Sequence, residues 1–257
     1  MYHHIDSYGI IVMVIRLNIL VTNDDGYLAY GIRLLANKLK RFGNVVIIAP
    51  DSNRSAISHA MNIHTPVTFK RVEDFLDIPV YTTSGNPSDC VRMGLNLLDI
   101  KFDIVFSGIN SGLNLGTDVH YSGTCAGARE ATINSVPGIS ISTGRENFKI
   151  VENEIDILLN KIFDGKLYSN DYFLNVNFPK KTFDKSKDFI IAKSGKKIFI
   201  TKFKNENGLV IEESHELIKD TNIDTDVYLH DIGYTTIVPI SIDPTEYDAY
   251  KKLKGQR

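Results

Sequence analysis

The chain alternates short apolar segments with segments of helical periodicity, and this alternation restricts it to few folds. The apolar segments are rich in β-branched residues, as in NVVIIAP at 44–50. Such runs are typical of parallel strands covered on both faces. We expect strands at 17–22, 44–50, 79–83, 102–108 and 138–142, and helices at 30–41, 87–98, 123–134 and 148–163. The order predicts a Rossmann-like, three-layer α/β/α core with a mostly parallel sheet.

The pattern changes from about residue 172. Strand-like pieces such as FLNVNFP and YTTIVPISID follow one another with turn residues between them, and a helical pattern returns only in the tail DPTEYDAYKKLKG. We therefore expect a β-hairpin-rich extension at about 172–245, attached to a core at about 17–165. Since no repeat or low-complexity linker separates them, both parts are assigned to one domain, residues 13–257.

Composition places the chain among ordinary globular proteins. It has 257 residues, of which 43% are hydrophobic and 23% charged, and a net charge of -2. That balance gives no general attraction to a nucleic-acid polymer or a membrane surface. Cys90 and Cys125 form no cysteine framework, so reduced thiols in a cytoplasmic protein are expected.

The N-terminal segment lacks the features of a membrane anchor or signal peptide. Its apolar run YGIIVMVI, at 8–15, is shorter than the roughly 18–20 residues of a membrane span. No Lys or Arg precedes this run, as one would in a signal peptide. The sequence favours Met13 as the natural start, with residues 1–12 as an N-terminal extension.

Polar loops follow three expected strands, at the ends where parallel sheets bind ligands. Strand 17–22 leads into Asp24 and Asp25, strand 44–50 into a loop with Ser55, and strand 102–108 into one with Asn110. These side chains should converge at one edge of the sheet. Carboxylate, hydroxyl and amide oxygens suit a hard divalent cation. A cation would also offset the repulsion between adjacent aspartates.

Each piece has a plainer interpretation on its own. Asp-Asp-Gly is a common turn sequence, and Asp25 is also placed to cap the next helix. The loop at 107–124 is glycine-rich, and its YSGT end suits phosphate binding at a helix N-terminus. It matches neither the dinucleotide-binding nor the Walker A glycine pattern. The motifs are specific only in combination.

In combination, the motifs ILVTNDDG, APDSNRSA, GNPSDCV, SGINSGLNLGTDVHYSGT and AREA resemble, in order and spacing, those of the SurE family of stationary-phase survival proteins. The resemblance is strong over 17–142 and looser beyond. It implies a metal-dependent 5'-nucleotidase that hydrolyses nucleoside 5'- and 3'-monophosphates, and in some members short polyphosphate. It also implies a homodimer or homotetramer.

By motif position, the resemblance places the family's metal ligands on Asp24, Asp25, Ser55 and Asn110. They would hold one divalent cation per subunit, Mg²⁺ or Mn²⁺, that activates a water molecule, with Asp24 or Asp25 as the proton acceptor. The other phosphate oxygens are assigned to Asn114, Ser122, Gly123 and Thr124. The chain departs from the family pattern at Asn86, often threonine, and at His120, commonly apolar, so His120 receives no catalytic role.

Two other functional classes stay open. An aspartyl-nucleophile phosphatase of the haloacid-dehalogenase kind normally separates its two aspartates by one residue, whereas Asp24 and Asp25 are adjacent. A non-catalytic nucleotide-binding or sensor protein could use the same sheet. His59 and His64 lack a third ligand at zinc spacing. Tyr121 is expected to pack against the protein rather than stack on a base.

Overall fold

The structure, a computed structural model, describes residues 3–5, 11–13, 16–145 and 147–255. Most of the expected N-terminal extension, residues 1–12, lies outside the described residues. In chain order the elements are β1 (His3–Ile5), β2 (Ile11–Met13), β3 (Leu17–Thr22), α1 (Tyr30–Leu39), β4 (Gly43–Pro50), β5 (Phe69–Arg71), β6 (Val80–Thr83), α2 (Pro87–Leu97), β7 (Ile104–Ser111), the 3-10 helix η1 (Gly116–His120), α3 (Gly123–Ile133), β8 (Gly138–Thr143), α4 (Phe148–Asp164), β9 (Tyr172–Asn177), β10 (Phe189–Ile191), β11 (Lys197–Glu206), β12 (Leu209–Lys219), α5 (Asp226–Asp231), β13 (Thr235–Ser241) and α6 (Tyr247–Lys254).

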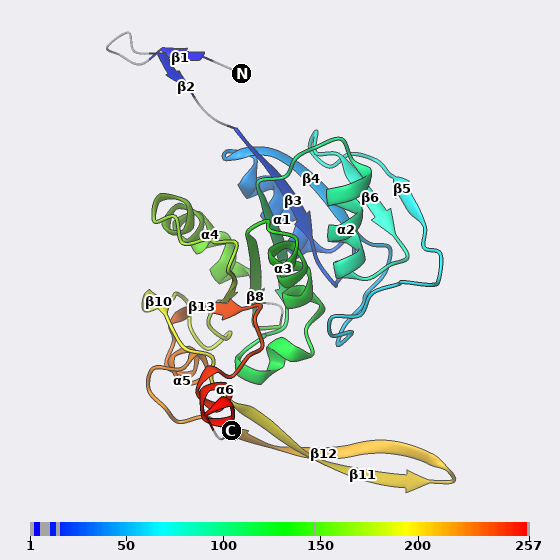
Figure 1. The fold of residues 1–257 in the computed structure, drawn as a ribbon, viewed down its shortest axis with the longest axis vertical. Coiled ribbons are helices and arrows are strands. Elements are labelled where there is room, and N and C mark those ends of the chain that lie inside the picture. The colour runs from blue at the N-terminus through cyan, green and yellow to red at the C-terminus, as the bar shows by residue number, and fades with distance from the viewer. Residues whose placement is uncertain (1–2, 6–10, 14–15, 146, 256–257) are drawn as a thin grey trace.

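A nine-stranded sheet forms the centre of the molecule (Figure 1). Its strand order is β10-β13-β9-β8-β7-β3-β4-β6-β5. The run from β9 to β6 is parallel throughout, whereas β13 pairs antiparallel with β9, and β5 antiparallel with β6. The order reverses between β3 and β7, so the loops after β3, β4 and β7 meet at the switch point where such sheets bind ligands.

Helices cover both faces of the sheet, which explains why its strands are apolar on both sides. Ile19 and Val21 of β3 pack in one cluster with α1 and α4 side chains, while Leu20 between them packs with α2 and α3. The same alternation occurs in β4, where Ile47 belongs to the first cluster and Ile48 to the second. The predicted three-layer α/β/α core is confirmed.

The C-terminal part shares this sheet. β9, β13 and β10 extend it beyond β8, across the boundary that the sequence suggests near residues 165–172. Helix α5 was not predicted from the sequence, because its six residues span too little chain to show periodicity. Val227 and Leu229 of that helix are nevertheless buried.

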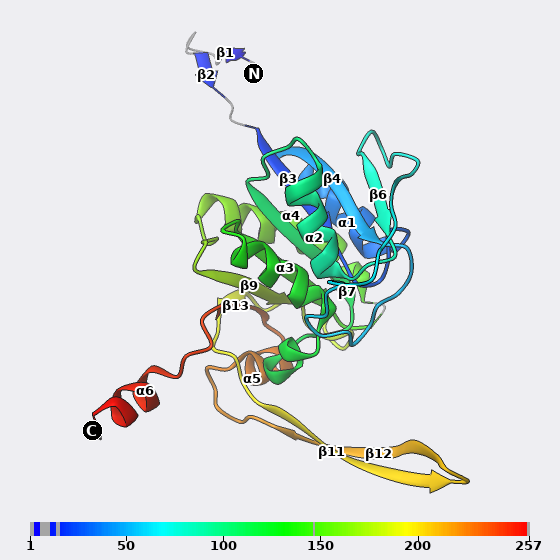
Figure 2. The ribbon, with the colours of Figure 1, turned by 45° about the vertical axis from the view of Figure 1, so that its right-hand side comes forward.

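The remaining strands of the C-terminal part form an arm, which we define as Lys197–Lys219. β11 and β12 pair antiparallel and are joined at Asn207 and Gly208, which both have positive φ (53° and 84°), as a two-residue hairpin turn requires. Figures 1 and 2 both show the arm extending away from the body. The predicted hairpin-rich extension is confirmed in this form.

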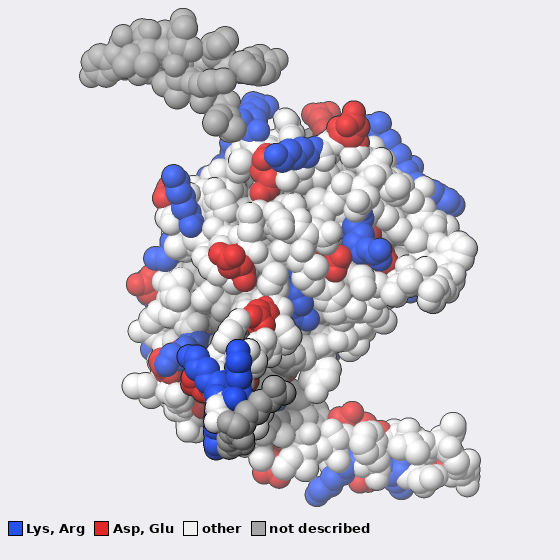
Figure 3. Space-filling model, viewed as in Figure 1, with Lys and Arg blue, Asp and Glu red and all other residues white. Residues whose placement is uncertain are grey.

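Charged residues of both signs are interspersed over the face of the molecule drawn in Figure 3, on the α/β core and on the arm alike. Among the described residues, no helix has the length and apolar character to cross a membrane.

Candidate active site

The turn after β3 is closed by Asn23 and Gly26 rather than by the two aspartates between them. The Asn23 side chain donates to Gly26 O at 3.0 Å and accepts from Gly26 N at 3.2 Å. Gly26 has φ +100°, a conformation that L side chains rarely adopt. Since a glycine and an asparagine hold the turn, the carboxylates of Asp24 and Asp25 are available for other contacts.

The possibility that Asp25 caps the next helix is wrong. Helix α1 begins after Ala29, which is its N-cap residue. Asp25 instead connects the loop after β4 to the end of β7: its Oδ1 accepts from the Asn53 amide at 3.3 Å and its Oδ2 from the Ser111 backbone N–H at 3.2 Å. Asp25 therefore lies where the loops after β3, β4 and β7 meet.

Asp24 is only 4% exposed and lies against the start of α3. Its Oδ1 accepts from the Thr124 hydroxyl at 2.5 Å. A side chain at Gly123 would place its Cβ 2.9 Å from the Asp24 Cβ, so only glycine lets the helix approach this closely. Gly123 and Thr124 thus fix the position of Asp24.

Burial raises the pKa of both carboxyl groups. For Asp24 desolvation dominates and raises the pKa from 3.8 to about 6, against the opposing effect of the Thr124 hydroxyl, while the charge of Asp25 adds to the increase. For Asp25, too, burial raises the pKa, and the hydrogen bond from Ser111 opposes it. Two partly desolvated, adjacent carboxylates favour a site that gains from positive charge.

A cavity of about 270 Å³ opens at this point, at the carboxyl ends of β3, β4 and β7. It is lined by all four predicted metal ligands and by two of the four predicted phosphate-binding residues: Asp24, Asp25, Ser55, Asn110, Asn114 and Ser122. The other two, Gly123 and Thr124, lie behind Asp24. Ser122 is the N-cap of α3, where its hydroxyl accepts from Cys125 N at 3.0 Å.

Local hydrogen bonds orient the two neutral candidate ligands. The Asn110 amide nitrogen donates to Gly112 O at 2.8 Å, so its amide oxygen is the atom that could coordinate a cation. Ser55 follows Arg54, whose backbone N–H donates to Asp24 O at 2.7 Å and attaches this loop to the turn after β3. Ser55 N also donates to the Asn53 side chain at 2.8 Å.

The donor set fits a hard divalent cation. Two carboxylates, a hydroxyl and an amide line the same small cavity, and oxygen ligands of these types suit Mg²⁺ or Mn²⁺. In the described part of the chain, no three His, Cys, Asp or Glu side chains are grouped as a metal site. The cation would therefore depend on neutral oxygens beside Asp24 and Asp25.

Sequence reasoning missed a buried asparagine clamp around Asn114. Asn177 Oδ1 accepts from Asn114 N at 2.8 Å, and the side-chain amides of Asn175 and Asn177 donate to Asn114 O at 2.7 and 3.1 Å. The Asn114 side chain donates to Ser142 Oγ at 2.8 Å. The available signal was NVN itself: two asparagines on the same face of an apolar strand, both fully buried.

Three further residues differ from or refine the sequence interpretation. Tyr121 lines the cavity and is 65% exposed, so the expected packing role is wrong. His59 is half-buried, and its Nε2 lies 2.8 Å from Oε2 of the buried Glu130. Arg145, which the sequence analysis did not consider, also lines the cavity.

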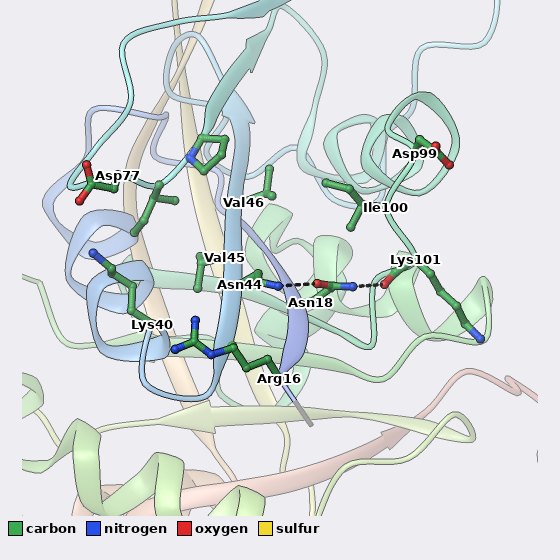
Figure 4. Close-up of a pocket in the computed structure, with 13 residues that line it drawn as sticks. Arg16, Asn18, Lys40, Asn44, Val45, Val46, Asp77, Asp99, Ile100 and Lys101 are labelled. Atoms are coloured by element: carbon green, nitrogen blue, oxygen red, sulfur yellow. Dashed lines mark hydrogen bonds between the residues drawn. The ribbon is translucent and has the colours of Figure 1, made fainter. Parts of the chain in front are cut away.

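A larger cavity, of about 610 Å³, lies at the other end of the central strands (Figure 4). Asn44 donates to Asn18 Oδ1 at 3.1 Å, and Asn18 donates to Lys101 O at 3.0 Å, as the dashed lines show. It lies at the amino ends of β3 and β4, where parallel sheets do not hold their active sites. The smaller cavity is therefore the candidate active site.

Fold and site together define an α/β protein with an oxygen-lined cavity at the switch point of a parallel sheet. The family model "Survival protein SurE" matches residues 19–201. The chain belongs to the SurE family.

Individual relatives agree over almost their whole length. The chain is 38% identical to a protein named 5'-nucleotidase SurE from Clostridium botulinum (strain 657 / Type Ba4), covering 93% of this chain and 98% of the relative. A relative of the same name from Thermoanaerobacter sp. (strain X514) is 39% identical with the same coverage. The crystal structure of the SurE protein from Aquifex aeolicus superposes with a TM-score of 0.77 at 31% identity, over 93% of this chain and 98% of that one.

Proposed function

We propose that the protein is a metal-dependent phosphatase that hydrolyses nucleoside 5'- and 3'-monophosphates to nucleoside and phosphate, with short polyphosphate as a further substrate. The observation that carries the proposal is the convergence of Asp24, Asp25, Ser55 and Asn110 on one cavity. Relatives named 5'-nucleotidase SurE at 38–39% identity support the substrate class.

Asp24, Asp25, Ser55 and Asn110 would hold one divalent cation, Mg²⁺ or Mn²⁺. When bound, such an ion polarises a phosphoryl oxygen and lowers the pKa of a water molecule beside it. Asp24 or Asp25 accepts the proton of the attacking water. Thr124 keeps Asp24 in place through its hydroxyl, and the Ser111 and Asn53 contacts do the same for Asp25.

The phosphate would lie between the cation and the start of α3. Asn114 and Ser122 line the cavity, and the first backbone N–H groups of α3, at Gly123 and Thr124, carry the partial positive charge of a helix N-terminus. The exposed ring of Tyr121 at the cavity offers an apolar face to a nucleobase. This combination favours a nucleotide over inorganic polyphosphate as the main substrate.

The direct test measures phosphate released from adenosine 5'- and 3'-monophosphates and from tripolyphosphate by the purified protein, with Mn²⁺, with Mg²⁺ and with a chelator. We expect release from the nucleotides that needs the metal. A phosphoaspartate trapped by acid quenching would instead establish the aspartyl-nucleophile class. Nucleotide binding without any phosphate release would establish the sensor class.

We propose also that the protein assembles as a homodimer or homotetramer through the arm. Large apolar side chains are exposed along both of its strands: Ile198, Phe199, Ile200, Phe203, Leu209, Val210, Ile211, Leu217 and Ile218. Apolar surface of this kind, on a hairpin extending from the body, is typical of an interface between subunits. Light scattering should give a mass of at least twice 28.8 kDa at micromolar concentration, and a monomer would refute this proposal.

A cytoplasmic location agrees with the cysteines. Cys90 and Cys125 are both free and buried, and burial raises the pKa of the Cys125 thiol to about 11. Such thiols are inert and need no oxidising compartment. Fractionation of cells that produce the protein at its natural level would test the location.

A further inference from the structure

The candidate active site lacks the positive charge that its proposed substrate needs. Three carboxylates line the cavity, those of Asp24, Asp25 and Asp118. Asp118 is already neutralised by Lys197 at the base of the arm. A divalent cation would balance Asp24 and Asp25, yet a phosphate monoester adds close to two further negative charges at neutral pH.

Arg145 is the one basic side chain among the described residues that line this cavity. It is exposed, and none of the ion pairs between described residues includes it. The other nearby arginines are engaged elsewhere. Arg54 contacts Asp51 and Ser84 O, and Arg129 lies over the Phe173 ring.

The loop that carries Arg145 is fixed at both ends. It connects β8 to α4, at the carboxyl end of a strand next to β7. Thr143 Oγ1 donates to Asn147 O at 3.1 Å, and Asn147 N donates to Gly144 O at 2.9 Å. The Asn147 side chain donates to Pro179 O at 3.0 Å. Thr143, Gly144 and Asn147 are therefore held in place, and the side chain of Arg145 reaches the cavity.

We propose that Arg145 binds the phosphate group of the substrate, with its guanidinium donating to two non-bridging oxygens. The planar fork of arginine matches such a pair of oxygens. The residue then contributes to substrate binding and to neutralising charge in the transition state, together with Asn114 and Ser122, which line the same cavity. This inference rests on the proposed phosphatase function, since it assigns a residue to the same site.

The test compares Arg145→Ala and Arg145→Lys with a control, Lys149→Ala. Lys149 is an exposed cation on α4 only four residues away and is not among the residues that line the cavity. Binding of inorganic phosphate is measured by calorimetry in Mn²⁺ at low ionic strength, where charge effects are not screened. Hydrolysis of adenosine 5'-monophosphate gives KM and kcat separately.

We expect Arg145→Ala to weaken phosphate binding and raise KM by about 10- to 100-fold. Arg145→Lys should recover part of this loss, and Lys149→Ala should behave as wild type. Phosphate affinity and KM within twofold of wild type in Arg145→Ala would overturn the inference. If the wild-type protein hydrolysed no nucleotide, the proposed function would be wrong. Weaker phosphate binding in Arg145→Ala would still show, in that case, that Arg145 binds the anion.

Discussion

The turn after β3 and the arm depart from the usual distribution of side chains in opposite directions. The turn buries charge: Asp24 is 4% exposed beside a second carboxylate. The arm exposes apolar surface, with Phe203 65% accessible. Neither departure stabilises an isolated chain, because desolvated charge and solvated apolar surface both cost free energy. Under the proposed function, the turn would gain stability from a bound cation, and the arm from an apolar partner.

The largest effect is expected from removing a carboxylate of the turn. Asp24→Asn and Asp25→Asn should each lower phosphatase turnover by on the order of 10² or more, because each removes a charged ligand. The control is Asp99→Asn, which should have no effect. Asp99 is an exposed carboxylate beside the cavity at the amino ends of the strands. Turnover at saturating Mn²⁺ is the measurement. Near-normal turnover in both site variants would show that Asp24 and Asp25 are only turn residues.

Asp24→Asn should also stabilise the metal-free protein, and this effect should depend on pH. The raised pKa of Asp24, about 6 against 3.8, means that ionisation disfavours folding. The wild type should therefore lose stability as pH rises from about 4 to about 6, and Asp24→Asn should lose less, because only Asp25 of the pair still ionises there. At pH 7.5 the variant should be more stable by about 2–3 kcal/mol, and at pH 3.5 the difference should vanish. Urea unfolding at both pH values measures this, and an equal difference at the two would contradict the charge-burial explanation.

A smaller loss should follow from removing the support of Asp24. Thr124→Val deletes the hydroxyl that donates to Asp24 Oδ1 and should lower turnover about tenfold. Because that hydrogen bond lowers the pKa of Asp24, its loss should also shift the acid limb of the activity profile to higher pH. Thr124→Ser retains the donor and is the matched control. Equal activity and pH profiles in the Val and Ser variants would show that the hydroxyl does not position Asp24.

The arm should respond in assembly rather than in stability. Phe203→Ser combined with Leu209→Ser should lower the mass by at least twofold, toward 28.8 kDa, since both side chains are exposed in the subunit. The subunit's free energy of unfolding, measured on dilute monomer, should change by less than about 0.5 kcal/mol. The control is Lys202→Ser with Glu213→Ser, which changes charged residues of the arm and leaves its apolar side chains in place. If light scattering gave both double variants the same mass as wild type, the arm would not be responsible for assembly.

The sequence predicts best where the signal is local. The β3 and β4 runs are apolar on both faces because helices cover both, and that composition is visible without a structure. Pro87 after Asn86 marks the start of α2, and Asn86 N–H donates to Asp89 Oδ2 at 3.0 Å there. The candidate ligands follow the same logic, because each lies at or near the end of an easily located strand: Asp24 and Asp25 after β3, Ser55 in the loop after β4, and Asn110 among the last residues of β7.

Features that depend on distant contacts could not be predicted. The clamp on Asn114 requires β9 to pair beside β8, and the hydrogen bonds of the clamp join residues 61 to 63 positions apart. Arg145 reaches the cavity only because the β8–α4 loop closes in a particular way. The exposure of Tyr121 depends on η1, whose Asp118 O accepts from Tyr121 N at 3.0 Å. Such side chains carry no periodic signal of their own.

The central claim is that the buried turn after β3 is a cation site, and titration of the metal-free protein with Mn²⁺ by calorimetry tests it most directly. We expect one ion per chain in the wild type, and affinity weakened at least tenfold in Asp24→Asn and in Asp25→Asn, with Asp99→Asn unchanged. Wild-type protein that binds no divalent ion, or site variants that bind it as tightly as wild type, would contradict the claim.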